Sequence, residues 1–259
     1  MGTPFDEAIE DIIRRKYHNQ RQQFHSDIVS EGILRDLLHT CNELRRDLES
    51  SEVKSWFNVP APGGRSRHID LMIGEPTPEG KPNLNRIRIC VENKSVMTAH
   101  RNKHARYDDL SELVKVLQEV RPETIVVCTV MIGVANRFLN VADRVTPFYK
   151  SRMAEFERKI LPRLSSGDQS LWTEFGAAVS TNKAHEPNST KERFLKLPTR
   201  SLGRIDKIGF DFLLLVPVFI NNVDPPYIAR SNDLGIDVNK EYNEMLVRVC
   251  KGYNTNWHR

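Results

Sequence analysis

Hydrophobic and polar residues follow two different periods along the first half of the chain. Between residues 27 and 49, apolar side chains recur every three or four positions, which predicts an amphipathic helix, and residues 4–17 repeat this pattern. The segments 67–74 and 86–94 alternate between apolar and polar residues instead, which is typical of half-buried strands. A loop rich in proline and glycine, residues 75–85, joins these two strands, so we expect an antiparallel hairpin.

The pattern continues with a helix and a fully apolar strand. Residues 100–120 return to the helical period, and residues 124–132 form an unbroken apolar run that suits a central strand covered on both faces. Strand, helix and strand in this order predict a parallel crossover. The remaining expected elements are a short strand at 56–59, helices at 136–163 and 169–179, an irregular basic stretch at 180–206, a strand at 210–220 and a helix at 238–251.

These elements predict one α/β domain that spans residues 1–259, with a mixed central sheet flanked by helices. Its expected parts are N-terminal helices at 4–49, a core at about 27–132, and C-terminal helical and strand additions at 133–259.

Composition narrows the class of protein only a little. Hydrophobic residues make up 39% of the chain and the formal net charge is +4, so a core is possible and a polyanionic partner is permitted. The four cysteines are widely spaced, which argues against a zinc framework and favours buried, reduced thiols. No basic-then-apolar leader is visible, and the longest apolar run, 212–220, is too short to cross a membrane. We therefore expect a cytoplasmic protein that does not insert into membranes.

The candidate chemistry lies on the two strands of the hairpin. Glu92 and Lys94 share a face because side chains two residues apart in a strand point the same way, and a hairpin can bring Asp70 beside them. Two carboxylates offer the oxygen ligands that Mg²⁺ prefers, and the metal lowers the pKa of a bound water. A neighbouring lysine can orient that water and stabilise charge on a phosphate. The trio therefore predicts phosphodiester hydrolysis.

The spacing Glu-x-Lys is weak on its own. It occurs four times in the chain, at Glu52/Lys54, Glu79/Lys81, Glu92/Lys94 and Glu157/Lys159. Only the third of these ends an alternating apolar strand and follows a strand that carries an aspartate. The alternative interpretation of this pair is an ordinary surface Glu–Lys pair on a half-exposed strand.

The trio and the element order around it resemble the PD-(D/E)XK nuclease superfamily, the fold of type II restriction endonucleases. The resemblance covers residues 27–132 and implies that Asp70 and Glu92 bind the metal while Lys94 serves the attacking water. Two positions depart from the family motif, because Ile69 stands in place of the proline and Asn93 in place of a more usual apolar residue.

Several further residues are candidates for the site. Family members often add an acidic residue from the preceding helix, for which Glu31 is the best candidate, although Glu31 could equally pair with Arg35 at the surface. Asn93 is included among the candidate metal ligands. The candidate DNA-binding residues beyond the motif are His100, Arg101, Lys103, Lys191 and Arg193.

The resemblance implies a Mg²⁺-dependent endonuclease acting on double-stranded DNA, most specifically a type II restriction endonuclease. We expect a homodimer, because a two-fold protein matches a palindromic site, and a companion DNA methyltransferase is possible. Two alternatives remain open at this point: another nuclease of the same superfamily, for DNA repair, junction resolution or RNA cleavage, and a non-catalytic nucleic-acid-binding module.

Overall fold

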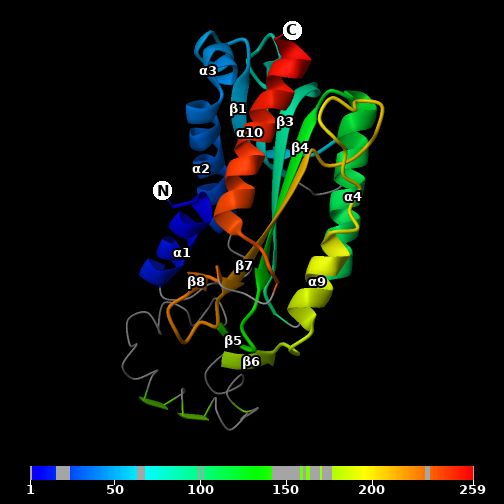
Figure 1. Ribbon diagram of the computed structural model, residues 1–259. Helices are drawn as coiled ribbons and strands as arrows, with labels where there is room; N and C mark the ends of the chain where they lie inside the picture. Colours follow the sequence, from blue (N-terminus) through cyan, green and yellow to red (C-terminus); the bar gives the residue numbers. More distant parts are fainter. Residues whose placement is uncertain are drawn as a thin grey trace.

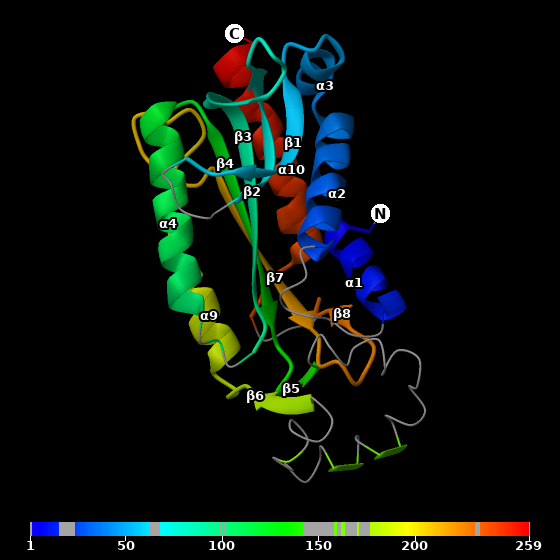
Figure 2. The same cartoon turned by 180° about the vertical axis from the view of Figure 1, so that it is seen from behind.

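A computed structural model of the chain describes residues 2–15, 24–62, 68–98, 100, 102–141, 158–159, 162–163, 170, 177–230 and 234–258. It is an α/β structure in which a mixed six-stranded sheet is flanked by helices on both faces (Figures 1 and 2). The predicted fold class, an α/β arrangement around a mixed central sheet, is confirmed at this level.

The central sheet has the strand order β1-β2-β3-β4-β7-β8. The first three strands form an antiparallel meander, β4 and β7 run parallel to β3, and β8 returns antiparallel to β7. The predicted hairpin and the predicted parallel crossover are therefore both confirmed. The strands are β1 (Lys54–Pro60), β2 (His68–Pro76), β3 (Pro82–Val96), β4 (Ile125–Gly133), β7 (Phe212–Phe219) and β8 (Tyr227–Ile228).

Helices cover the two faces of this sheet unequally. Four helices pack on one face: α1 (Pro4–Arg15), α2 (Phe24–Thr40), α3 (Asn42–Glu49) and α10 (Val238–Trp257). Two others, α4 (Lys103–Val120) and α9 (Glu186–Phe194), lie on the opposite face. In Figure 1 the parallel strands β4 and β7 run downward, and a small second sheet of β5 (Arg137–Val141) and β6 (Ala177–Thr181) lies below them.

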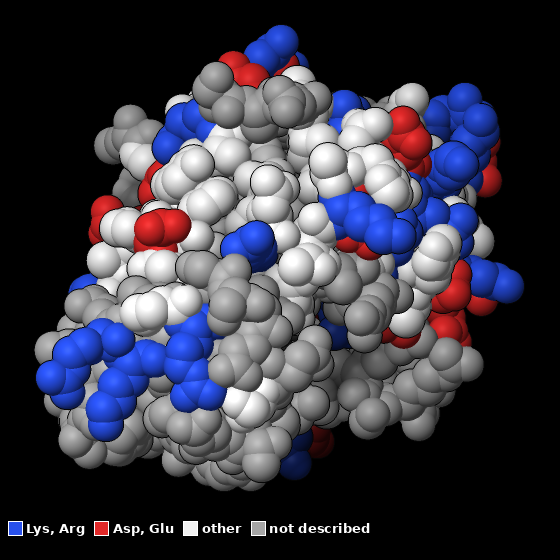
Figure 3. Space-filling view, turned by 90° about the horizontal axis from the view of Figure 1, so that it is seen from below, with Lys and Arg blue, Asp and Glu red and all other residues white. Residues whose placement is uncertain are grey.

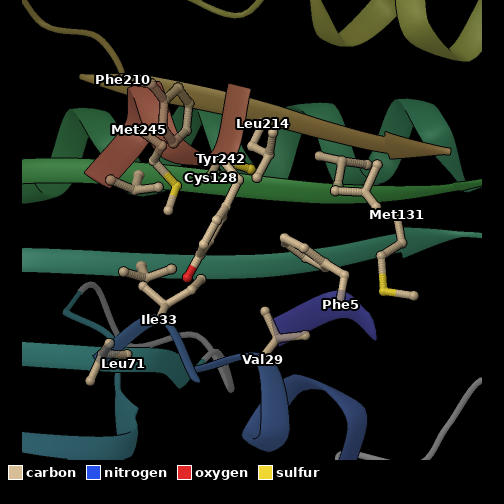
Figure 4. Close-up of a cluster of buried hydrophobic side chains, with 14 of the residues drawn as sticks. Phe5, Val29, Ile33, Leu71, Cys128, Met131, Phe210, Leu214, Tyr242 and Met245 are labelled. Atoms are coloured by element: carbon tan, nitrogen blue, oxygen red, sulfur yellow. The ribbon is translucent and has the colours of Figure 1, made fainter. Parts of the chain in front are cut away.

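The hydrophobic core joins segments from both ends of the chain. Figure 4 shows Tyr242 from α10 reaching toward Phe5 and Ile33 of the N-terminal helices, with Met245 of α10 and sheet residues such as Leu71 and Leu214 around them. Phe5 and Tyr242 meet edge to face at 6.2 Å between ring centroids. The C-terminal helix thus completes the core that the N-terminal helices begin.

A buried arginine connects the helices α3 and α10 to the central sheet. Arg88 on β3 is 5% exposed, and its guanidinium forms ion pairs with Asp47 at 2.9 Å and Glu75 at 3.2 Å. The same group donates to the Tyr253 hydroxyl at 2.9 Å. Because these partners come from α3, β2 and α10, one side chain ties three elements to the central strand.

Several predicted elements need correction. The expected single helix at 27–49 is broken at Cys41 into α2 and α3, and residues 137–141 and 177–181 are strands, not parts of helices. The stretch 180–206 contains the helix α9. Most of the helices expected at 136–163 and 169–179 fall outside the described residues.

The cysteines divide into two kinds. Cys41, between α2 and α3, forms a disulfide with Cys250 on α10, so the expectation of reduced thiols was wrong for this pair. A spacing rule could not find it, because the two residues are separated by 209 positions. Cys90 and Cys128 are free and buried, as predicted. Within the described ranges, no helix is long and apolar enough to cross a membrane.

The disulfide predicts a redox-dependent stability. Replacing Cys250 by serine should lower the free energy of unfolding by about 2–4 kcal/mol, because the cross-link restricts a long stretch of the unfolded chain. Urea unfolding with and without dithiothreitol measures this effect. The reductant should bring the wild type to the level of the Cys250→Ser variant and leave the variant unchanged. Cys90→Ala is the matched control. A wild-type free energy of unfolding that is the same with and without dithiothreitol would contradict the cross-link.

Candidate metal-binding and catalytic site

Asp70, Glu92 and Lys94 come together where β2 and β3 stop pairing. The ladder between these strands ends with Leu71 opposite Val91, and beyond it the Asp70 carboxylate accepts the backbone N–H of Asn93 at 2.6 Å. Lys94 forms an ion pair with Glu92 Oε1, which confirms that these two side chains share a face. The expected convergence of two carboxylates and one amine from adjacent strands is therefore present.

Glu92 is the most unusual group of the three. Its side chain is 5% exposed, and its Oε2 atom has no hydrogen-bond partner among the described residues. Burial raises the pKa of Glu92 to about 7, although attraction to Lys94 opposes this shift and the charge of Asp70 adds to it. A buried carboxylate oxygen without a partner is costly, so this position favours a bound cation.

The other two groups are shifted by the same surroundings. Burial raises the pKa of Asp70, while the hydrogen bond from Asn93 and the charge of Lys94 partly offset it. Burial tends to lower the pKa of Lys94, but the Glu92 and Asp70 carboxylates together outweigh burial, so the net shift is upward. Lys94 is therefore an ammonium at neutral pH, able to donate hydrogen bonds to an anion.

The donor set fits a hard divalent cation. Two carboxylates contribute oxygen ligands, which suit Mg²⁺, a metal that retains several waters in protein sites. Within the described residues, the one group of three His, Cys, Asp or Glu ligand atoms closer than 4.8 Å is Cys41, Glu43 and Cys250, where the disulfide occupies both sulfurs. The site at Asp70 and Glu92 thus supplies a two-carboxylate set, not a closed cage.

Glu31 does not join this site. Its side chain is exposed on α2, and it is not part of a cluster of ligand atoms with Asp70 and Glu92. Asp27, one helical turn earlier, is closer, because its negative charge contributes to the raised pKa of Asp70. Asp27, like Glu31, is not part of a cluster of ligand atoms with Asp70 and Glu92, so within the described residues no acidic side chain of α2 completes the predicted ligand set. Asp27 lies in the first turn of α2, and nothing in the sequence pattern distinguished it from Glu31 as a neighbour of Asp70.

Asn93 is also not placed as a metal ligand. Its amide nitrogen donates to Ser30 Oγ at 2.8 Å, and its amide oxygen accepts from Thr129 Oγ1 at 2.7 Å. Because successive residues of a strand point to opposite faces, Asn93 faces away from Glu92 and Lys94. Its side-chain oxygen is already engaged.

The predicted DNA-binding residues separate into buried and exposed groups. His100 is 2% exposed, with Nδ1 2.6 Å from Thr190 Oγ1 and Nε2 3.1 Å from the Gly133 carbonyl, so it is an internal residue and not a surface contact. Arg101 lies outside the described residues. Lys103 and Lys191 are partly buried and bond to Ser189 Oγ and the Leu234 carbonyl, respectively.

Arg193 lies over the ring of Tyr107, with 3.7 Å between its Cζ atom and the ring centroid, and near Asp108. Lys103 and Arg193 therefore belong to the contact between α4 and α9, whereas Lys191 joins α9 to the segment before α10. All three retain only part of their surface for a ligand. Figure 3 views the end of the molecule toward which the parallel strands run, where lysine and arginine side chains gather in separate groups.

The sequence analysis missed Arg106. This residue lies on α4, and its positive charge acts on Lys94 across the face of β3. Its Nη1 atom lies 3.6 Å from Asp109 Oδ2, its Nε atom has no hydrogen-bond partner among the described residues, and its side chain is 42% exposed. Arg106 is therefore better placed than His100 to meet a phosphate beside the trio. Its position on the helix after the motif was the only sequence signal.

The basic stretch 180–206 contains a residue that serves the fold. Arg200 is 4% exposed, pairs with Asp211 through both Nε and Nη2 at 3.0 Å, and donates to the carbonyls of Pro122 and Thr124. We expect Arg200→Met to lower the free energy of unfolding by about 3–5 kcal/mol, because it leaves the buried Asp211 without its partner. Urea unfolding measures this change, with exposed Lys196→Met as the control. A stably folded Arg200→Met variant that loses only DNA binding would contradict this structural role.

The buried His100 makes the stability of the fold depend on pH. Burial lowers the pKa of His100 from its ordinary value of 6.5, so the unfolded chain binds the proton first as the pH falls. The contribution of His100 to the free energy of unfolding should therefore decrease below about pH 6.5, by up to about 1.4 kcal/mol per pH unit. Glu92, whose pKa is raised to about 7, contributes in the opposite direction over the same range, so the His100 contribution is the difference between the wild type and a His100 variant. Chemical unfolding between pH 7.5 and roughly 5 measures this slope. His100→Gln should show a shallower slope, and equal slopes in the two proteins would rule out His100 as the source.

Comparison of the chain with protein-family models, with curated proteins and with solved structures gave no match in any of the three. The assignment of a function therefore depends on the arrangement of Asp70, Glu92 and Lys94 and on the elements that hold them.

Proposed function

We propose that the chain is a Mg²⁺-dependent endonuclease that hydrolyses phosphodiester bonds in double-stranded DNA. The observation that carries this proposal is the buried Glu92 carboxylate, whose Oε2 atom has no hydrogen-bond partner in the described part of the chain, while Oε1 pairs with Lys94 and Asp70 lies on the adjoining strand. A cation placed between the two carboxylates would compensate both buried negative charges.

The order of the elements supports a restriction-endonuclease-like fold. Helices α2 and α3, the antiparallel strands β1, β2 and β3, helix α4 and the parallel strand β4 follow one another between residues 24 and 133. Apart from the additional short helix α3, this is the order of helix, three strands, helix and strand that the PD-(D/E)XK resemblance implies. Both acidic positions of the motif then lie where β2 and β3 separate. The specific form we propose is a type II restriction endonuclease, acting as a homodimer.

Each residue of the trio has a distinct role. Asp70 and Glu92 would hold Mg²⁺, which lowers the pKa of a bound water and offsets charge on the phosphate. Lys94, held as an ammonium by Glu92, donates hydrogen bonds to the attacking water or to a phosphate oxygen. Arg106 adds positive charge on the same side. Attack by water would leave a 5′-phosphate and a 3′-hydroxyl.

This function predicts metal-dependent cleavage that requires all three residues. The purified full chain should convert plasmid and phage DNA to discrete fragments with Mg²⁺ and should not do so with excess EDTA. Asp70→Asn, Glu92→Gln and Lys94→Met should each reduce the cleavage rate by roughly 10²-fold or more, because each removes a group that acts on the transition state. Gel analysis of time courses measures these rates.

The chain offers a matched control in a second Glu-x-Lys pair. Glu79 and Lys81 have the same spacing but are exposed in the loop between β2 and β3, so Glu79→Gln and Lys81→Met should cleave like the wild type. A smear in place of bands would exclude the restriction-type form and retain a nuclease. The proposal would be overturned if the folded wild type cuts neither plasmid nor phage DNA with Mg²⁺, or if the variants at Asp70, Glu92 and Lys94 cut at the wild-type rate.

A further inference from the structure

A chain of hydrogen bonds lies behind the candidate site, on the side of the sheet that α2 covers. Thr129 Oγ1 on β4 donates to Asn93 Oδ1 on β3 at 2.7 Å. Asn93 Nδ2 then donates to Ser30 Oγ at 2.8 Å and to Ser26 Oγ at 3.3 Å, both on α2. Thr129 and Ser30 are 1% and 0% exposed, so water does not compete for these bonds.

The donor and acceptor groups fix which atom donates at each step of this hydrogen-bond series. The amide nitrogen of Asn93 can only donate, so the Ser26 oxygen acts as the acceptor and the Ser26 hydroxyl proton is free to point elsewhere. The Ser26 side chain is close enough to the Asp70 carboxylate to oppose, by hydrogen bonding, the rise in the pKa of Asp70 that burial causes. Thr129 therefore fixes the orientation of the Asn93 amide, and Asn93 in turn orients Ser26 toward Asp70.

Residue 93 holds Asp70 by a second path as well. The backbone N–H of Asn93 donates to Asp70 Oδ2 at 2.6 Å, in the place where the β2–β3 ladder has ended. Both hydrogen-bond donors to Asp70 thus depend on where Asn93 lies. A side chain fixed by two donors loses less orientational freedom when it binds an ion.

We propose that Asn93 is a positioning residue, through which Thr129 and the first turns of α2 hold the Asp70 carboxylate ready for a cation. This inference rests on the proposed function, since it assigns Asp70 to the metal. It also explains the departure at the middle position of the motif. An apolar residue there would leave the Ser30 and Thr129 hydroxyls buried without this partner, whereas the asparagine amide satisfies both.

Two substitutions at Thr129 separate hydrogen bonding from packing. Thr129→Val keeps the shape and removes the hydroxyl, while Thr129→Ser keeps the hydroxyl and removes a methyl group. If Asn93 positions Asp70, the valine variant should raise the half-saturating Mg²⁺ concentration about 10-fold, while its rate at saturating Mg²⁺ changes less than about threefold. The serine variant should stay within about twofold of the wild type on both measures.

Asn93→Leu should move the Mg²⁺ requirement in the same direction and further. In an Asp70→Asn background, Thr129→Val should add nothing, because the group that it positions is absent. All variants are compared at a temperature at which each is fully folded. Equal effects of valine and serine, or a lower saturated rate with an unchanged Mg²⁺ requirement, would overturn the positioning role and leave packing as the explanation.

A readout that needs no metal keeps this inference distinct from the proposed function. Hydrogen exchange of the Asn93 backbone amide, which donates to Asp70, should be faster in Thr129→Val than in Thr129→Ser or the wild type. If the wild type neither binds Mg²⁺ by calorimetry nor cleaves DNA but this difference is present, Asn93 positions Asp70 and the nuclease proposal fails. If the wild type binds Mg²⁺ and cleaves while exchange and Mg²⁺ requirement are unchanged in the valine variant, only the positioning role fails.

Discussion

The buried ion pair between Glu92 and Lys94 is the interaction on which the candidate site depends. A carboxylate that has lost its hydration needs compensation from neighbouring charges and donors. Lys94 compensates one oxygen of Glu92, the other has no partner among the described residues, and Asp70 adds more negative charge nearby. The buried Glu92 oxygen without a partner, more than the spacing of the motif, distinguishes Glu92 and Lys94 from the exposed pair of Glu79 and Lys81.

The two-residue period of β3 lets neighbouring side chains perform separate tasks. Glu92 and Lys94 present charge on one face, where the positive charge of Arg106 on α4 repels that of Lys94. Asn93 points to the other face and bonds to α2 and to β4. Asn93, the middle residue of the motif, thus anchors β3 to α2 and β4 on the face opposite Glu92 and Lys94. Gly133, at the end of β4, allows the chain that leaves β3 to pass closely, because a Cβ atom there would lie 2.4 Å from the Met97 carbonyl oxygen.

Buried arginines show why a count of charges does not locate a binding surface. Arg88 and Arg200 are both almost fully buried, and each satisfies its guanidinium with carboxylates and other polar groups from distant segments. In the sequence they look like the exposed basic residues around them. Guanidinium groups suit such sites because their planar set of donors can serve several acceptors at once. Their positive charge supports the fold and is not available to a polyanion.

The sequence by itself determined the features that depend on local periodicity and turn chemistry. These are the α/β class, the hairpin between residues 67 and 94, the crossover to β4, and the shared face of Glu92 and Lys94. Tertiary structure alone decided which segments that are distant in the chain meet. It closed the bond between Cys41 and Cys250, buried His100, replaced Glu31 by Asp27 near Asp70, and formed strands at 137–141 and 177–181. The physical reason is that burial and pairing depend on groups far away in the chain, whereas a hydrophobic period is written in consecutive residues.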